Sequence, residues 1–292
     1  MDLERFDRQL LLFGQAGQEK IADTRVVISG LGGTGSHTAQ QLTFLGVRKF
    51  GLIDADHATK SSRNRLIGMR PFDVEAKTPK VVIAERMIRE IEPEADITIV
   101  NDTFLSEAGA AELARRSTIF GCMDRDGARL LLNEFACAYN RPYFDIATDT
   151  DKDGGRVTFG GRLMVRTGGD ACLYCMDLLD RQAVRRDLAS PERRDEEDAM
   201  YGVRRDVLGD RGPSVVALNG ILASIAVTEF MVFVTGVPRA PKRLLRYDGA
   251  RGIVNEPRDQ PQSDCPYCTQ AGTGDAEDWA RHIRAGLGRW VR

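Results

Sequence analysis

The sequence predicts an α/β fold built on a twisted, mostly parallel sheet with helices on both faces. Three observations lead to this prediction. Strand-like and helical runs alternate through residues 1–150, a glycine-rich turn joins the first strand to a helix, and two Cys-x-x-Cys pairs follow in the second half. We expect antiparallel strands and a structural zinc site of four cysteines in that second half.

The first half contains five strand-like runs, each bounded by turn residues or helical sequence. They are 25–29, 49–53, 96–100, 118–122 and 142–146. Helices are expected at 35–45, 78–92, 106–116 and 127–139, where apolar residues recur at helical spacing. Because a helix follows most of these strands, neighbouring strands should pair in parallel.

The second half has a different pattern, although we expect residues 1–292 to form one domain. Residues 156–166 resemble a β-hairpin or two short strands around Gly160 and Gly161. A late strand is expected at 244–247 and an amphipathic tail helix at 275–292. The densely charged stretch within 176–213 should be a mobile loop that crosses the domain. Residues 1–150 would then bind a nucleotide and 151–292 a protein substrate.

Composition limits the classes of function. The 292 residues are 42% hydrophobic and carry a formal charge of −2, which provides no field to gather nucleic acid. The mixed, acidic start has no apolar leader, so we expect a cytoplasmic protein. The apolar stretch 214–237 carries only one charge, Glu229, but also Asn219 and Gly220, which favours a buried core helix over a membrane span.

Four of the six cysteines form two matched pairs, Cys172/Cys175 and Cys265/Cys268. Four thiolates are the number that a closed tetrahedral zinc site needs, and such a site leaves no open position for substrate. The second pair begins 90 positions after the first ends, so the metal would fix the tail of the chain to its middle. Cys122 and Cys137 lie in apolar sequence and are expected to be inert core thiols.

The turn Gly30-Leu31-Gly32-Gly33-Thr34-Gly35 follows the first strand and opens a helix. Such glycines let the backbone approach phosphates, while the helix presents its N-terminal amides to negative charge. Asp54 ends the second strand, where a carboxylate can bind ribose hydroxyls. These features suit a dinucleotide or ATP equally well, and a merely structural turn is the alternative.

The residues that follow favour ATP. Thr78 and Pro79 suit the N-cap and first turn of a helix, and this places Lys80 at the end where a cation is unfavourable by about 0.3–1 kcal/mol. A bound anion would reverse that cost. A pyrophosphate leaving group requires cations in a way that a dinucleotide does not, and Arg8, Arg65 and Lys80 supply them.

The chain resembles the ThiF/MoeB superfamily of adenylating enzymes related to ubiquitin activators, over nearly its whole length. The resemblance depends on motifs that occur in the same order. They are Arg5-Phe6-Asp7-Arg8-Gln9, the GxGGxG turn with Asp54, Arg65, Thr78-Pro79-Lys80, Cys122-Met123-Asp124 and the two cysteine pairs.

The resemblance implies a Rossmann-like sheet with adenylation at its carboxyl edge and zinc away from the chemistry. It also implies a homodimer in which Arg8 enters the partner's ATP site as an arginine finger. Arg65 and Lys80 would contact the phosphates, and Asp124 would hold Mg²⁺ beside the α-phosphate. The alternative for Asp124 is a helix cap. The alternative for Arg8 and Arg65 is a surface ion pair. The nucleotide site as a whole would comprise Gly30, Gly32, Gly33, Gly35, Asp54, Asp56, Asn64, Arg65, Lys80 and Asp124. Arg129 and Asn133 match family positions near the nucleotide.

Two departures from the family pattern are informative. Ser61-Ser62 stands where the family usually has Ser-Asn, so one nucleotide contact is replaced, and Asn64 is a candidate substitute. Residues 176–213 contain no cysteine, although relatives that form a thioester usually carry it there. The chain therefore resembles the members that form only the adenylate.

The sequence thus predicts ATP-dependent adenylation of the C-terminal carboxylate of a small ubiquitin-like or sulfur-carrier protein. The product would be passed to a sulfurtransferase or a conjugating enzyme. An NAD-dependent oxidoreductase with a structural zinc and a catalytically inactive scaffold subunit are the alternatives.

Overall fold

The computed structural model describes residues 4–115, 117–153, 156–169, 171–195, 214–258, 260–274 and 276–291. In these residues one eight-stranded sheet runs through the molecule, in the order β3-β2-β1-β4-β5-β6-β7-β8. The strands are β1 Arg25–Ser29, β2 Lys49–Ile53, β3 Asp96–Val100, β4 Thr118–Gly121, β5 Tyr143–Asp153, β6 Arg156–Arg166, β7 Leu244–Asp248 and β8 Ile253–Asn255. Strands β1–β5 pair in parallel and β6–β8 are antiparallel, which confirms the predicted fold class.

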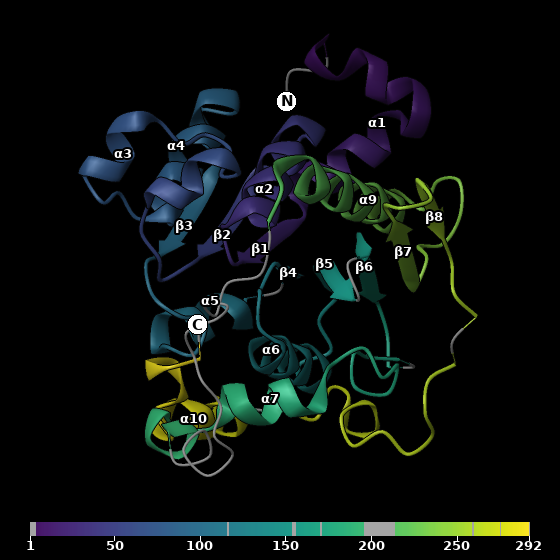
Figure 1. Ribbon diagram of the computed structural model, residues 1–292. Coiled ribbons are helices and arrows are strands. Elements are labelled where there is room, and N and C mark those ends of the chain that lie inside the picture. Colours follow the sequence, from purple (N-terminus) through teal and green to yellow (C-terminus); the bar gives the residue numbers. More distant parts are fainter. Residues whose placement is uncertain are drawn as a thin grey trace.

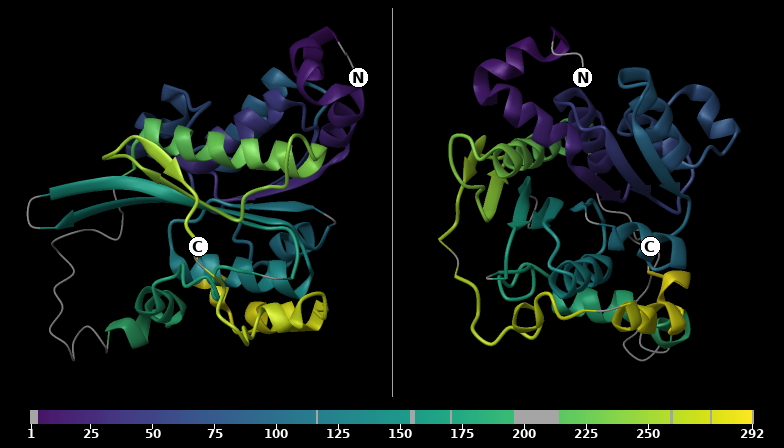
Figure 2. Two further views of the ribbon diagram at one scale, coloured as in Figure 1. Left: turned by 90° about the vertical axis from the view of Figure 1, so that its right-hand side faces the viewer. Right: turned by 180° about the vertical axis from the view of Figure 1, so that it is seen from behind.

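Helices cover both faces of this sheet (Figures 1 and 2). One face carries α1 Asp7–Asp23, α2 Gly33–Leu45, α4 Lys80–Ile91 and α9 Val216–Thr235. The other carries α5 Glu107–Ala114, α6 Asp126–Ala138, α7 Arg181–Leu188 and α10 Ala276–Arg284. Strand side chains alternate between the two cores: Val26 and Ile28 contact one set of helices and Val27 the other.

The carboxyl ends of three neighbouring strands are aligned, and this defines where a site can form. Ser29 pairs with Ile53 on one side and with Gly121 on the other. Beyond them, the Gly30 amide donates to the Ile53 carbonyl at 2.9 Å and the Cys122 amide to the Ser29 carbonyl at 2.8 Å. The loops that begin at residues 30, 54 and 122 therefore leave the sheet side by side, at the edge where open α/β sheets bind ligands.

Helix α9 corresponds to the apolar stretch of the sequence. It is long and apolar enough to cross a membrane by composition, but half of its apolar window is buried in the molecule. Its buried side chains, among them Leu222, Ala226 and Phe230, pack with α1, α2 and the strands into one core. This packing accounts for the apolar composition of the helix.

The structure corrects the prediction for residues 156–166. They form one continuous strand paired with β5 along its whole length, not a hairpin around Gly160 and Gly161. A Cβ at Gly160 would lie 2.1 Å from the carbonyl oxygen of Tyr247, and one at Gly161 would lie 2.3 Å from that of Ala147. The two glycines thus allow close approach of the neighbouring strands and do not mark a turn.

Other elements differ from expectation by smaller amounts. The polar loop after β2 contains a 3-10 turn, Lys60–Asn64, and the short helix α3, Pro71–Glu75. Helix α7 lies inside the stretch 176–213 that was expected to be a loop, and residues 196–213 of that stretch fall outside the described residues. The tail forms α10 and a 3-10 turn, Leu287–Arg289, in place of one helix.

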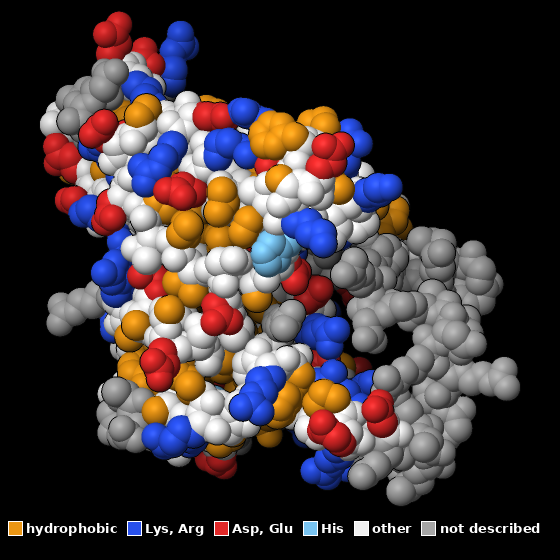
Figure 3. All heavy atoms as spheres, turned by 90° about the vertical axis from the view of Figure 1, so that its left-hand side faces the viewer, with side chains coloured by type: hydrophobic (Ala, Val, Ile, Leu, Met, Phe, Trp, Pro, Cys, Tyr) orange, Lys and Arg blue, Asp and Glu red, His pale blue; other side chains and the backbone are white. Residues whose placement is uncertain are grey.

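The face that bears α3, α4 and the edge strand β3 has positive and negative side chains interspersed (Figure 3). Arg70 and Glu90 form an ion pair, and so do Arg89 and Glu85 at 3.0 Å. Like the near-neutral net charge, this distribution provides no single-sign field on that face.

Candidate functional site

The glycine turn after β1 is shaped by two close approaches. Gly30 has φ +90°, a conformation that favours glycine, and a Cβ there would lie 2.6 Å from the Cys122 carbonyl oxygen. A Cβ at Gly35 would lie 1.9 Å from the Gly30 carbonyl oxygen. Around Gly32, in contrast, no described atom lies within 4 Å of that position. The open side of the turn therefore lies at Gly32, next to the N-terminus of α2, where amides can receive a phosphate.

Gly33 has a different environment. A Cβ on Gly33 would lie 2.0 Å from Nδ2 of Asn219 on α9. Asn219 is buried; its Nδ2 donates to Ser214 Oγ at 3.0 Å, and its Oδ1 accepts from Thr34 Oγ1 at 3.3 Å. The glycine at position 33 thus makes room for α9 against the turn. Sequence analysis did not identify Asn219 as part of this region.

Asp54 connects the glycine turn to the next loop. Its Oδ2 accepts the Leu31 amide at 2.6 Å and its Oδ1 the Asp56 amide at 2.8 Å. Burial raises the pKa of Asp54, while the nearby Lys80 ammonium and the two amides oppose that rise. The carboxylate therefore holds the backbone of the turn, and each oxygen keeps a lone pair for a ribose hydroxyl, the role predicted for it.

Lys80 lies between two carboxylates. Its Nζ is 2.7 Å from Asp56 Oδ2 and 3.8 Å from Asp54 Oδ1. Helix α4 begins at Lys80 with Pro79 as N-cap, so the assignment of Thr78 as N-cap was wrong by one residue. The two aspartates already compensate the ammonium at this helix end. The unfavourable interaction between Lys80 and the helix dipole is therefore offset without a bound anion.

The other predicted phosphate ligand, Arg65, follows the 3-10 turn. Its Nη1 donates to the Ser61 carbonyl and, at 3.3 Å, to Asn64 Oδ1. Ser62 is buried, and its hydroxyl lies 2.9 Å from that of Thr59 in a capping box. The serine that replaces the family asparagine thus stabilises the turn, and the exposed Asn64 lies beside Arg65.

Asp124 lies just beyond β4 with its side chain exposed. No hydrogen bond or ion pair connects it to any part of the chain that the structure describes. The cap alternative fails, because the N-cap of α6 is Arg125, which makes no side-chain cap bond. Asp124 is thus available at the carboxyl edge to bind a cation.

Arg8 is not part of this group within one chain. It projects from α1 with 90% of its side chain exposed, and its Nε lies 3.9 Å from Asp7. Arg129 is buried next to the Asp124 loop and donates to the Met123 carbonyl and to Asp145 Oδ1 at 2.8 Å. Asn133 accepts the Leu173 amide at 2.9 Å, inside the first cysteine pair, and its place near the nucleotide stays a prediction.

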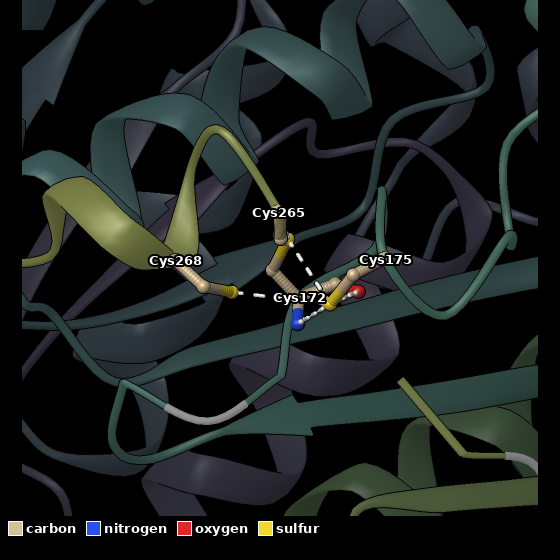
Figure 4. A group of neighbouring side chains, drawn as sticks. All are labelled: Cys172, Cys175, Cys265 and Cys268. Atoms are coloured by element: carbon tan, nitrogen blue, oxygen red, sulfur yellow. Dashed lines mark hydrogen bonds between the residues drawn. The ribbon is translucent and has the colours of Figure 1, made fainter. Parts of the chain in front are cut away.

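The four paired cysteines converge on one point, as Figure 4 shows, with all four sulfurs within 4.8 Å of one another. The Sγ–Sγ distances are 3.6 Å for Cys172–Cys265, 3.8 Å for Cys172–Cys175 and 3.9 Å for Cys175–Cys268. A tetrahedral zinc with bonds of about 2.3 Å has sulfur–sulfur edges of about 3.8 Å, so the cluster fits this metal.

The surroundings of the cluster suit a structural metal. The Cys172 amide donates to Cys175 Sγ at 3.2 Å, and the rings of Tyr174 and Tyr267 pack edge to face at 5.2 Å between their centroids.

The two cysteines outside the cluster are Cys122 and Cys137. Burial raises the pKa of the Cys122 thiol to about 12. A hydrogen bond with Cys172, together with burial, raises the pKa of Cys137. Both remaining thiols are therefore protonated at neutral pH, as expected of inert core cysteines.

Comparisons with known proteins agree with this geometry. The model of the ThiF family matches residues 6–267. The sulfur carrier protein ThiS adenylyltransferase of Escherichia coli K12 is 27% identical over 91% of this chain and 95% of its own. The molybdopterin-synthase adenylyltransferase of the same strain is 26% identical over 92% and 97%. In fold, the chain is similar to E. coli MccB, the microcin C7 biosynthetic enzyme, solved with N-formylated MccA. That structure gives a TM-score of 0.70 at 16% identity and covers 91% of this chain and 75% of MccB.

Proposed function

Because the chain belongs to the ThiF family and is an adenylyltransferase, we propose that it activates the C-terminal carboxylate of a small ubiquitin-like or sulfur-carrier protein with ATP. A carboxylate oxygen attacks the α-phosphorus, the bond to the β-phosphate oxygen breaks, and pyrophosphate leaves with the electron pair. One observation carries the proposal: three features lie together at the carboxyl edge of the sheet. They are the open side of the glycine turn, the ion pair between Lys80 and Asp56, and the Asp124 carboxylate.

The site would mainly position two anions and neutralise charge. Gly32 and the N-terminus of α2 receive phosphate oxygens, and Asp54 binds the ribose. Lys80 exchanges its contact with the exposed Asp56 for the leaving pyrophosphate, and Arg65 assists it. Mg²⁺ held by Asp124 would supply positive charge beside the α-phosphate.

A homodimer would complete the site by contributing Arg8 from the partner. Two observations support this: Arg8 is exposed on α1, and two exposed apolar residues, Leu11 and Phe44, lie on α1 and on the adjoining α2. A mixture of the Arg8→Ala and Asp124→Ala variants tests the arrangement. Mixed dimers have one intact site, so random exchange of subunits should restore about one quarter of the wild-type rate. No recovery after the subunits have exchanged would contradict action in trans.

The cysteine cluster would hold zinc in a structural role, since four thiolates fill its coordination. Without a cysteine in residues 176–213, the acyl adenylate would pass to an external acceptor, a sulfurtransferase or a conjugating enzyme. Six free cysteines and no disulfide among the described residues suit a cytoplasmic location.

Pyrophosphate exchange into ATP, measured with candidate carrier proteins, tests the proposal. We expect exchange that depends on an intact carrier C-terminus and is lost in Asp124→Ala. ATP binding without exchange for any carrier would favour the scaffold alternative. The dehydrogenase alternative predicts stabilisation by NADH and none by ATP with Mg²⁺, which a thermal shift measures directly.

A further inference from the structure

A buried ionic cluster lies directly behind the loop that carries Asp124. Its centre is Asp145 on β5, whose side chain is 0% exposed. One carboxylate oxygen accepts from Arg129 Nη1 at 2.8 Å and from the Tyr143 hydroxyl at 3.0 Å. The other accepts from Arg162 Nη1 at 3.0 Å. A single carboxylate thus bridges two guanidinium groups in the interior.

Stability alone does not account for such a cluster. A buried ion pair is costly to desolvate, and apolar residues of similar volume often serve a core equally well. The chain nevertheless places charged residues at this position, between β4, β5, β6 and α6.

Each arginine uses its second amino group to fix a backbone carbonyl in a different segment. Arg129 Nη2 donates to Met123, the residue before Asp124. Arg162 Nη2 donates to Leu178 at 2.6 Å, three residues after the last cysteine of the first pair and shortly before α7. Asp145 therefore connects the Asp124 loop to the backbone at Leu178.

The Asp124 loop depends on these contacts for its position. Among the described residues no hydrogen bond or ion pair holds the Asp124 side chain, so its position depends on the backbone at Met123. On the other side, Met123 Sδ lies 3.5 Å from Ser29 Oγ, next to the glycine turn. A shift of Met123 would thus move Asp124 relative to the nucleotide edge.

We propose that Asp145 is a positioning residue of the adenylation site, which acts through Arg129 on the backbone that carries Asp124, while Arg162 fixes it to the backbone at Leu178. The inference depends on the proposed function, because it assumes that Asp124 binds Mg²⁺. Asp145 itself touches neither substrate nor metal.

The test compares ATP affinity with and without Mg²⁺ in the full chain and needs no carrier protein. Calorimetry gives the Kd for ATP in EDTA and in excess Mg²⁺, and the ratio of the two measures the contribution of the metal. We expect Asp145→Asn to reduce this ratio about tenfold or more, in the range found for residues that orient metal ligands. The Kd in EDTA should stay unchanged. Adding Asp145→Asn to Asp124→Ala should have no further effect on the ratio, because both act on the same contact.

The matched control is Glu112→Gln. Glu112 is also a buried carboxylate bound to an arginine, Arg25 at 2.6 Å, but Arg25 begins β1 at the opposite edge of the sheet. This variant should lower the melting temperature and leave the ratio unchanged. If Asp145→Asn behaves in the same way, its role is structural and the inference is wrong.

A milder variant decides the case if Asp145→Asn does not fold. Arg129→Lys keeps the charge beside Asp145 but cannot reach both Asp145 and the Met123 carbonyl with a planar fork. We expect a partial loss of the Mg²⁺ effect, and a wild-type ratio would overturn the inference. A wild-type chain that binds ATP equally with and without Mg²⁺ would instead contradict the metal role of Asp124, and thus the proposed function itself.

Discussion

Replacing Cys265 by serine removes one of the four sulfurs that fix the tail of the chain to its middle. The other three cannot close a tetrahedral site, so the chain should lose its zinc. Loss of the zinc removes the link between Cys175 and Cys265, which lie about 90 residues apart in the sequence. For a cross-link that closes a loop of this length, the chain-entropy relation gives about 4.6 kcal/mol at 25 °C.

This free energy converts into a measurable melting temperature. Unfolding entropy is about 2.1 cal/mol/K per residue, or about 0.6 kcal/mol/K for 292 residues. Loss of the metal should therefore lower the melting temperature by about 7.5 °C. The double variant Cys172→Ser/Cys265→Ser should cost little more than the single one, because one missing ligand already abolishes the site.

Elemental analysis and thermal unfolding measure the two quantities together. We expect one zinc per chain in the wild type and in the control Cys122→Ala, which removes a cysteine outside the cluster. Hydrogen exchange should accelerate in residues 260–274 and in α10, and not in β1 or α2. A wild-type protein without zinc, whose melting temperature is the same as that of Cys265→Ser, would refute the reasoning.

Three further predictions concern the nucleotide edge. Gly33→Ala should destabilise the fold by about 1–3 kcal/mol through overpacking against Asn219. Adding Asn219→Ala should restore the melting temperature. Equal melting temperatures for the single and the double variant would contradict the packing role. Lys80→Ala should weaken ATP binding at least tenfold in calorimetry, since it leaves Asp54 and Asp56 without their cation; unchanged affinity would remove Lys80 from the phosphate site. Because burial raises the pKa of Asp54 above 3.8, the folded chain binds this proton more tightly than the unfolded one. Its contribution to stability therefore grows as the pH falls through the folded-state pKa, whereas ATP affinity should decline over the same interval, and Asp54→Asn should abolish both trends in pH-dependent melting and binding curves.

The sequence was sufficient to find most of the sheet. The bounds of β1, β2 and β3 agree with prediction, because short runs rich in apolar and β-branched residues between polar turns are distinctive. Strand β6 was misread because glycine usually signals a turn. At Gly160 and Gly161 the missing side chain serves the approach of β5 and β7, a reason that depends on neighbours distant in sequence.

The candidate site, too, could be predicted only in part from the sequence. The cysteine pairs and the glycine turn have fixed local spacing, so they could be recognised directly, and the structure brings all four paired sulfurs together. The assigned roles of Arg8, Arg65 and Asp124 stay predictions. The buried partners could not be found, because an isolated polar residue such as Asn219 or Asp145 in an apolar run has no characteristic spacing.

These missed residues have a common consequence for the site. Asn219 binds Ser214, the first described residue after the segment 196–213, and contacts the glycine turn through Thr34. Asp145, through Arg162, binds Leu178 on the other side of that segment. Ser214 is therefore linked through Asn219 to the glycine turn, and Leu178 is linked through Arg162, Asp145 and Arg129 to the loop that carries Asp124.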